Sequence, residues 1–327
     1  MFVRGLLSAA LIGAGLAGLL GRTASAEEAS AFPSKPISLI VPFQAGVSAD
    51  LLFRGIAEAA SKHLGQPVII DNKPGGSATL GPASMAAGAK PDGYTVGQIA
   101  IPVFRVPYMQ KATFDPVKDF TYILNLGGYT LGAVVKADGP FKSWVEVSAF
   151  AKANTGKFTY ATIGPATTNA IAMELMSRQS GVQFTHIPSK GGGESIAAVL
   201  GGHVMMMVES PAWAPQVAAG DFRLLLLLNG QRSKKWPETP TLKELGYTYE
   251  FDSPFGLAGP KGMDPAIVKK LHDAFKKAYE DEKVIELFDR FDFVRRYMST
   301  ADYQAFVVKL AAEEKAALEK LGLARKD

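Results

Sequence analysis

Short apolar runs alternate along the chain with longer amphipathic segments, and this alternation constrains the fold more than any other feature. Apolar runs at 38–43 and 158–162 are each followed, across a polar loop, by apolar residues at helical spacing, at 50–65 and 170–181. Strands that alternate with helices in this way are typical of a doubly wound sheet. The sequence therefore predicts an α/β fold built on largely parallel sheets.

Two passages of extended sequence divide this pattern. They lie at 122–135 and 250–256, and a second alternating series begins near residue 140. A chain of this length favours two hydrophobic cores over one. We therefore expect two α/β lobes, each a doubly wound sheet, joined by two crossing strands. The expected first lobe comprises residues 32–125 and 250–327, and the expected second lobe comprises residues 126–249.

Five consecutive leucines at 224–228 form the longest apolar run after the first 26 residues, flanked by Arg223 and Asn229. A short continuous apolar run is typical of a strand that is buried on both faces. We expect this run to be a strand of a parallel sheet.

Residues 1–26 have the pattern of a cleaved secretory signal peptide. Arg4 supplies the positive start, an apolar middle follows, and Ala24 and Ala26 match the small-residue cleavage pattern. A membrane anchor is the alternative, but the apolar stretch is shorter than the ~20 residues that a spanning helix needs. The pattern favours export to the periplasm of a Gram-negative cell.

The charge of the mature chain is nearly balanced. The whole sequence carries 35 basic and 31 acidic residues, a net charge of +4, and the leader contributes Arg4 and Arg22 with no acid, which leaves +4 − 2 = +2. Near balance without a basic, aromatic-rich stripe argues against nucleic acid as a partner. The sequence contains no cysteine, so burial rather than disulfides must stabilise the exported protein.

The loop at 41–50 reads VPFQAGVSAD and leads from the first predicted strand into a helix. Ligands of such sheets bind where strand ends lead into helix N-termini, whose unpaired N–H groups attract anions. Gly46 lets the backbone approach a ligand, and Ser48 or Asp50 can cap the helix. The alternative is an ordinary turn, since turns need glycine and serine for their own geometry.

A second loop, at 162–169, has a similar construction. Thr167 and Thr168 follow Gly164 and precede a predicted helix. Two helix N-termini that converge on one cleft from opposite lobes suit a ligand with a carboxylate at each end.

Motifs for other chemistries are absent from the sequence. The glycine-rich turns at 74–79 and 188–195 have neither the P-loop pattern nor the G-x-G-x-x-G spacing. The four histidines are scattered without metal-ligand spacing, so we expect no metal and no cofactor. Asp50 could serve as the base of a periplasmic hydrolase, but no G-x-S-x-G nucleophile motif accompanies it, and we expect no enzyme activity.

Longer motifs resemble the Bug family of periplasmic solute-binding proteins, also known as the receptors of tripartite tricarboxylate transporters. The resemblance runs nearly from end to end. Its most specific parts are GQPVIIDNKPGG at 65–76, PDGYT at 91–95 and TPTLKELG at 239–246.

This resemblance implies a monomeric two-lobe clamshell, similar to type II periplasmic binding proteins, that closes on a small carboxylate. It implies that backbone groups of the two cleft loops, 43–50 and 162–169, hold the ligand. A dicarboxylate, an aromatic acid and an amino acid all remain open. Delivery to a tripartite tricarboxylate-type membrane permease is the implied role, and a ligand-sensing subunit for a membrane histidine kinase is the alternative.

The sequence departs from the usual family pattern at a few positions. Residues 44–47 read Gln-Ala-Gly-Val in place of a Pro-Pro-Gly-Gly type of sequence, Asn169 replaces a common histidine, and Phe255 replaces a frequent tryptophan. Arg105 lies where the family is variable. The expected ligand-binding residues are Phe43, Gln44, Ala45, Gly46, Ser48, Asp50, Ser77, Arg105, Thr162, Gly164, Ala166, Thr167, Thr168, Asn169, Ser189, Lys190, Glu209 and Phe255.

Overall fold

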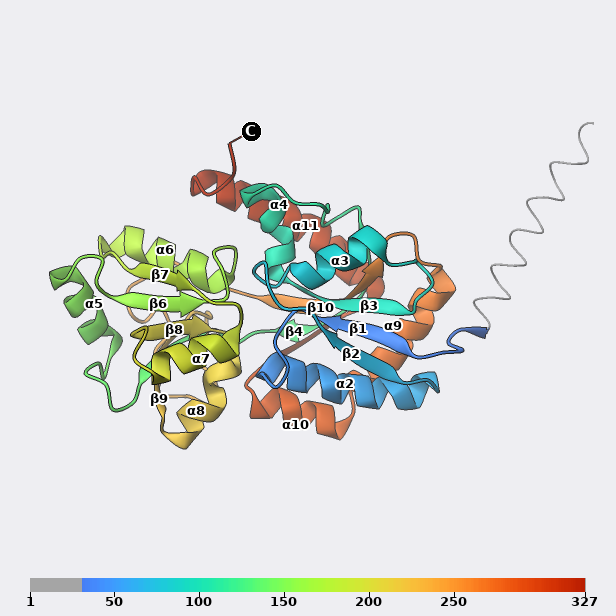
Figure 1. The fold of residues 1–327 in the computed structure, drawn as a ribbon, viewed down its shortest axis with the longest axis horizontal. Helices are drawn as coiled ribbons and strands as arrows, with labels where there is room; N and C mark the ends of the chain where they lie inside the picture. The colour runs from blue at the N-terminus through green and yellow to red at the C-terminus, as the bar shows by residue number, and fades with distance from the viewer. Residues whose placement is uncertain (1–30, 327) are drawn as a thin grey trace, which may run out of the picture.

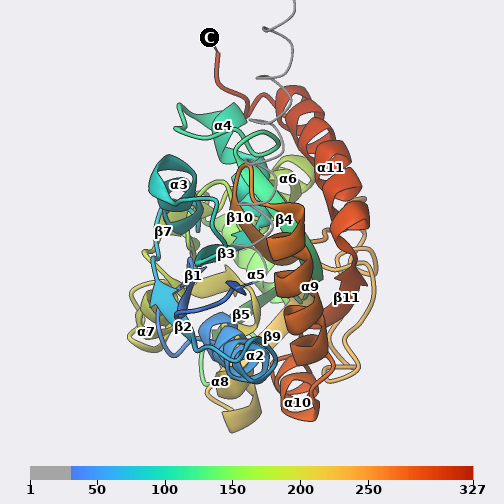
Figure 2. The same ribbon diagram turned by 90° about the vertical axis from the view of Figure 1, so that its right-hand side faces the viewer.

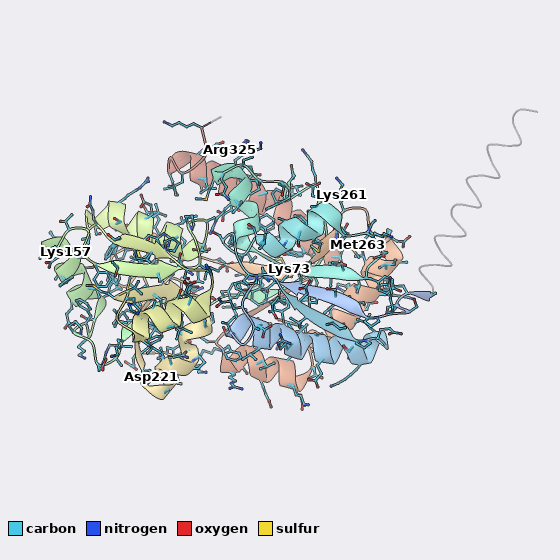
Figure 3. The ribbon with its side chains drawn as sticks, in the orientation of Figure 1. Lys73, Lys157, Asp221, Lys261, Met263 and Arg325 are labelled. Atoms are coloured by element: carbon cyan, nitrogen blue, oxygen red, sulfur yellow. The ribbon has the colours of Figure 1, made fainter. Side chains whose placement is uncertain are left out.

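The chain folds into two α/β lobes that lie side by side (Figure 1). The computed structural model describes residues 31–326, and within them one lobe contains a six-stranded sheet and the other a five-stranded sheet. Figure 3 shows Lys157 and Asp221 on one lobe and Lys261 and Met263 on the other. The predicted two-lobe α/β fold is confirmed. The predicted signal peptide lies outside the described residues. Within residues 31–326, every helix is too short or too polar to cross a membrane.

The sheet of the first lobe has the strand order β11-β4-β10-β3-β1-β2. Its strands are β1 (Ile37–Val41), β2 (Val68–Asn72), β3 (Thr95–Ala100), β4 (Phe120–Gly128), β10 (Pro254–Pro260) and β11 (Val294–Met298). Strand β1 pairs in parallel with β2 and β3, whereas β10 runs antiparallel to both β3 and β4.

The sheet of the second lobe has the strand order β7-β6-β8-β5-β9. Its strands are β5 (Gly132–Lys136), β6 (Thr159–Thr162), β7 (Thr185–Pro188), β8 (Met206–Glu209) and β9 (Phe222–Leu227). Strand β6 pairs in parallel with β7 and β8, and β5 runs antiparallel to β8 and β9.

Both sheets are mixed rather than parallel because the chain crosses between the lobes twice. It leaves the first lobe through β4 and enters the second directly as β5, and it returns as β10. Strands β5 and β10 each enter their sheet from the other lobe, and both are antiparallel to the strands beside them.

The run at 224–228 forms a strand that points the same way as β6, β7 and β8, but the predicted parallel pairing is wrong. Most of the run belongs to β9, which lies at the edge of its sheet and pairs antiparallel with β5. The leucines at 225–228 are nevertheless buried. A later segment covers this edge, because Leu227 N–H donates to Pro240 O and Leu242 N–H donates to Leu227 O.

Helices cover both faces of each sheet. In the first lobe α2, α9 and α10 share a core with one face, and α3 and α11 pack on the other face. Figure 2 shows α9 and α10 beside α2. The helices of this lobe are α2 (Ser48–Leu64), α3 (Leu80–Gly88), α4 (Val106–Met109), α9 (Pro265–Tyr279), α10 (Glu282–Arg290) and α11 (Thr300–Lys320), with a 3₁₀ turn at η1 (Ile101–Phe104).

In the second lobe α7 and α8 cover one face of the sheet, and α5 and α6 cover the other. The helices of this lobe are α5 (Trp144–Ala153), α6 (Thr168–Ser180), α7 (Gly192–Leu200) and α8 (Ala214–Ala219), with a 3₁₀ turn at η2 (Pro211–Trp213). Local signals fix the ends of α6, since the Thr167 side chain caps its first turn and Gly181 adopts the left-handed conformation after its last.

The C-terminal helix α11 connects the two lobes. Its early turns pack on the first sheet through Tyr303 and Val307, and its last turn places Leu318 in an apolar cluster with Ile171 and Leu175 of α6. Figure 1 shows α11 extending over the second lobe. The two lobes are therefore in contact at this end of the molecule as well as through the crossing strands.

Candidate functional site

A small cavity lies where the carboxyl ends of strands from both sheets meet. Because β1 is parallel to β3, and β6 to β8, the loops that follow these strands emerge at the same edge of each sheet. The cavity has a volume of about 30 Å³. Phe43, Ile101 and Tyr129 supply an apolar wall, and Asn169 and Glu209 supply polar groups from the second lobe.

Five of the predicted site residues line this cavity, and they come from the loops after β1 and β6, the start of α6 and the end of β8. They are Phe43, Thr167, Thr168, Asn169 and Glu209. The loop at 162–169 therefore contributes more of the wall than the loop at 43–50, which reaches the cavity through Phe43. In this closed structure the start of α6, and not the start of α2, opens onto the cavity.

The first loop is held by Asp50. Its carboxylate accepts hydrogen bonds from Gly46 N–H, Arg54 Nε and Asn72 Nδ2, each at 2.8 Å. The expectation that Ser48 or Asp50 caps the helix is wrong, because Val47 occupies the N-cap position and receives no side-chain cap. Asp50 lies three residues beyond the N-cap position and instead closes the loop in front of the helix.

The electrostatics of Asp50 are those of a stabilised carboxylate. Burial disfavours its ionised form, but the hydrogen bonds from Arg54, Gly46 and Asn72 outweigh this effect and lower the pKa of Asp50 below its ordinary value. A carboxylate with a lowered pKa that already accepts three hydrogen bonds is a weak general base. This geometry argues against the hydrolase alternative.

The second loop is organised by threonine hydroxyls. Thr167 Oγ1 accepts from Ala170 N–H at 3.2 Å and donates to Gly164 O at 2.8 Å. Thr162 Oγ1 accepts from Gly164 N–H at 3.2 Å and lies 2.9 Å from His186 Nε2. These bonds fix the turn and orient the first turn of α6 toward the cavity.

Arg105 joins the two lobes. Its guanidinium donates to both carboxylate oxygens of Glu314, at 2.6 and 3.0 Å, and through Nη1 to Thr168 Oγ1 at 2.8 Å. Arg105 comes from the first lobe and Thr168 from the start of α6. The guanidinium is thus paired with a carboxylate of its own lobe, and it holds the second lobe by a hydrogen bond.

The lobes also meet through two glycines of the second lobe. A Cβ at Gly164 would collide with the side chain of Ser77, and a Cβ at Gly191 would lie 2.6 Å from Gln44 Cδ. Ser77 has a positive φ of 56°, a conformation that costs energy for a residue with a side chain. This close approach defines a closed arrangement of the lobes.

Glu209 is the last residue of β8, and it is 2% exposed. Burial raises the pKa of its carboxyl to about 8, against the opposing effect of the backbone N–H groups of Ile163 and Ser210. Glu209 Oε1 and Asn169 Oδ1 are both buried and have no hydrogen-bond partner among residues 31–326.

The remaining predicted residues lie around the cavity. Ser189 N–H donates to Thr162 O at 2.8 Å, and its hydroxyl is 2.7 Å from that of Ser195. Ala45, Gly46 and Lys190 are exposed, whereas Ser48 and Ala166 are buried behind the loops.

Phe255 is part of the core and not of the cavity wall. It is fully buried, and its ring lies 4.7 Å from that of Tyr129, measured between centroids. Phe288 and Phe293 pack against it on other sides. The prediction that Phe255 contacts the ligand is therefore corrected, since it supports Tyr129 from behind.

Sequence reasoning missed cavity residues on the crossing segments. Tyr129 and Leu131 lie between β4 and β5, and Ser253 lies directly before β10. They fall within the extended passages at 122–135 and 250–256. A crossing strand must pass the junction of the lobes, and this signal could have identified them.

The described residues do not include three His, Cys, Asp or Glu side chains gathered as metal ligands would be. The polar groups at the cavity are threonine hydroxyls, one amide and one carboxyl, next to a helix N-terminus. This set suits an organic anion better than a cation.

Comparisons with known proteins give a consistent result. A model of the family described as "Tripartite tricarboxylate transporter family receptor" matches residues 52–323. The "UPF0065 protein in gbd 5'region" of Cupriavidus necator is 50% identical over 308 residues, which cover 94% of this chain and 94% of that protein. The BugT protein of Bordetella pertussis is 31% identical over 265 residues, 80% of this chain and 81% of that one.

Solved structures share the fold. The periplasmic binding protein BugD superposes with a TM-score of 0.85 at 24% identity, covering 90% of this chain and 100% of that one. The R. palustris protein Rpa4515, solved with adipate, superposes with a TM-score of 0.83 at 25% identity, covering 90% and 99%.

Proposed function

Because this chain belongs to the tripartite tricarboxylate transporter family of receptors, the Bug family, we propose that it captures a small carboxylate in the periplasm and delivers it to a tripartite tricarboxylate-type membrane permease. The family is one of solute-binding receptors and not of enzymes. The ligand is bound, transported and released without chemical change.

The observation that carries this proposal is the cavity at the meeting edges of the two sheets. The first turn of α6 opens onto it, and unpaired N–H groups at a helix start attract a carboxylate. Phe43 and Tyr129 provide an apolar wall for the carbon chain of an acid. Rpa4515, a protein of the same fold, was solved with adipate, which supports an organic acid of this size.

The closed contacts support a clamshell mechanism. The cavity, at about 30 Å³, is small beside the ~300–1,000 Å³ of typical ligand pockets. We propose that the lobes separate to admit an acid. We propose the lobe boundaries 32–125 plus 250–327 and 126–249, with a monomer as the functional unit. The strand content of the two sheets supports this division except at β4, which extends beyond residue 125 to Gly128 within the first sheet.

Isothermal titration calorimetry on the exported protein, purified from the periplasm, tests the proposal. The panel contains linear dicarboxylates of four to eight carbons, aromatic dicarboxylates and, as controls, diamines of matched length. We expect saturable binding of at least one acid with a dissociation constant of about 1 µM or below, and no binding of the diamines. Silence across all the acids from protein with a native circular dichroism spectrum would contradict the proposal.

A further inference from the structure

Glu209 is the only acid among the cavity-lining residues at 31–326, and those residues include no lysine, arginine or histidine. The residue is 2% exposed, and its Oε1 has no hydrogen-bond partner within the same range. A buried polar atom without a partner is costly, and native proteins satisfy nearly all such groups. Oε1 is therefore an open position for a group of the ligand.

The Glu209 carboxyl lies beside the loop that leads into α6. Glu209 ends β8, which is a parallel neighbour of β6, and the backbone N–H groups of Ile163 and Ser210 donate hydrogen bonds to its carboxyl. Ile163 directly follows β6, and it lines the cavity together with Thr167, the N-cap of α6. The carboxyl is thus at the same edge as the helix start that attracts a carboxylate.

The Glu209 carboxyl is mainly neutral at pH 7. Burial raises its pKa to about 8, so about nine molecules in ten carry the proton at pH 7. Oε1 has no partner, whereas two N–H groups donate to the carboxyl, and the proton is therefore placed on Oε1. A protonated carboxyl donates through this O–H.

The titratable groups nearest to Glu209 are uncharged near neutral pH. Tyr129, also on the cavity wall, accepts a hydrogen bond from Gln98 Nε2 at 2.5 Å. Burial raises the pKa of Tyr129 and of Tyr160 on β6 above the ordinary tyrosine value. Burial lowers the pKa of His186, on β7 beside β6, below its ordinary value of 6.5. Glu209 is therefore the lining residue whose charge changes between pH 7 and pH 9.

Charged side chains on the other surrounding elements have partners or reach the surface. Arg105 bonds to Thr168 on the cavity wall, but it is paired with Glu314. Asp252, next to the lining residue Ser253, pairs with Arg296. The charged residues of β5, α6 and α7 are partly or fully exposed, and they are Lys136, Glu174, Arg178 and Glu194.

We propose that Glu209 binds the acid as a neutral carboxyl, whose Oε1–H donates to a carboxylate oxygen of the ligand. This inference rests on the proposed function and assigns the side chain that recognises the anion. A hydrogen bond from an O–H to a carboxylate is charge-assisted and stronger than a bond between neutral groups. An ionised Glu209 would instead repel the ligand, so the deprotonated protein should bind poorly.

Acid binding should therefore depend on pH. Simple carboxylic acids titrate near pH ~4, so the ligand stays ionised from pH 7 to pH 9 and only the protein changes. The affinity should fall about tenfold between pH 7 and pH 9, because Glu209 ionises through its pKa of about 8. At pH 8 binding should take up about half a proton per acid bound.

Calorimetry tests the inference in two stages. Succinate, glutarate, adipate, pimelate, suberate and terephthalate are first titrated at pH 6 and pH 7. The acid that binds most tightly is then titrated at pH 7, 8 and 9 into the wild type, Glu209→Gln and the control Glu174→Gln. Glu174 lies on α6 at the surface, where it pairs with Arg178. Titrations at pH 8 in phosphate and in Tris, whose ionisation enthalpies differ, measure the proton uptake.

The amide in Glu209→Gln keeps an N–H donor but does not titrate. This variant should still bind the acid at pH 7, and its affinity should change less than about twofold up to pH 9. Its binding at pH 8 should take up no proton. Glu174→Gln should keep the tenfold fall and the proton uptake of the wild type. A circular dichroism spectrum at each pH shows that the protein stays folded.

Equal affinity of the wild type at pH 7 and pH 9 overturns the inference and leaves the proposed function standing. A fall that persists in Glu209→Gln also overturns it, since another group then titrates. A folded Glu209→Gln that does not bind at pH 7 has the same consequence, because the amide can donate the same bond.

If Glu209→Gln does not fold, Glu209→Met takes its place. Methionine has no proton to donate, so this variant should bind at least about tenfold more weakly than the wild type at pH 7, and undiminished binding overturns the inference. Failure of all six acids at pH 6 and pH 7 contradicts the inference and the proposed function together.

Discussion

Asp50 is fully buried and yet ionised, because three donors surround its carboxylate. One donor is the backbone of the loop itself, one is the next turn of the same helix, and one comes from β2. The residue therefore ties the loop at 43–50 to both its helix and its neighbouring strand. Its contribution to binding is indirect, through the shape of that loop.

The Asp50→Asn variant should be less stable than the wild type by about 1–3 kcal/mol at pH 7, because an amide cannot accept all three hydrogen bonds. The lowered pKa of Asp50 makes this stabilisation fully present above its ordinary value of 3.8. It is lost as the pH falls below 3.8 and through the folded-state pKa. Urea unfolding at pH 7 and at pH 3 measures both effects.

Asp71→Asn is the matched control, since Asp71 is largely exposed and pairs with Lys73 at the surface. Its substitution should change the free energy of unfolding by less than about 1 kcal/mol. Equal stability of Asp50→Asn and the wild type at pH 7 would show that the carboxylate does not hold the loop.

Which single residues could be predicted depended on their place in the chain. Thr167, Thr168 and Asn169 lie where the turn after β6 meets α6, and the composition of such a βα turn can be recognised in the sequence. Phe255 was misjudged because an aromatic side chain in an extended passage fits a cavity wall or a core equally well. Only the contact with Tyr129 decides between them.

Helix α6 is the element on which binding depends most, because its first turn faces the cavity. Its start is set by local sequence, since Thr167 both caps the helix and bonds to Gly164 O. The same residue thereby shapes the turn and orients the N–H groups that the ligand is proposed to meet.

Thr167→Val removes the cap and should cost about 0.5–2 kcal/mol of stability. For a protein of this size that corresponds to a fall in melting temperature of about 2–4 °C per kcal/mol. Acid affinity should fall in parallel, because the first turn of α6 frays. Differential scanning calorimetry and titration of the same samples measure the two effects.

Thr167→Ser keeps the hydroxyl and serves as the matched control. It should restore both the melting temperature and the affinity nearly to wild-type values. If Thr167→Val bound the acid as well as Thr167→Ser does, the helix start would have no part in recognition.

At the element scale the sequence predicted strands and helices well but not strand pairing. Periodicity reports burial and helical spacing, and these are local. Strand β9 runs in the same direction as β8, but the strand it pairs with is β5, which enters from the other lobe. A crossing connection is a property of the whole chain, so five leucines at 224–228 could not reveal it.

The proposed function requires the whole molecule to open and close, and the two lobes touch at Ser77 and Gly164. The chain contains no cysteine, so a pair of new cysteines at these positions can form only one disulfide. An ideal Cβ at Gly164 lies 3.1 Å from Ser77 Cβ, slightly below the usual 3.5–4.5 Å between disulfide-linked Cβ atoms. Forming the bond requires a shift of either loop and a change of the Gly164 backbone from its φ of 141°, which cysteine rarely adopts.

The double variant Ser77→Cys/Gly164→Cys should lose acid binding when oxidised, because the proposed mechanism requires the lobes to separate before a ligand enters. Reduction with dithiothreitol should restore binding in the same sample. Ser77→Cys alone, treated with the same oxidant, controls for the chemistry and should bind as the wild type does. Undiminished binding by the oxidised double variant would mean that the acid does not enter between the lobes.

The lobe boundaries at 125/126 and 249/250 stay a prediction, and the predicted two-lobe architecture is confirmed by the fold. Alternation of elements and the two extended passages were sufficient for the architecture. The size of the cavity and the closed contacts depend on side chains that meet across the lobes, such as Gln44 and Gly191. No local pattern contains that information.

A crystal structure of the protein with its most tightly bound acid tests the central claim most directly. The account predicts a carboxylate within hydrogen-bond distance of the backbone N–H groups at the start of α6, with the rest of the acid against Phe43 and Tyr129. An acid bound outside the junction of the lobes, or held chiefly by surface lysines and arginines, would contradict it.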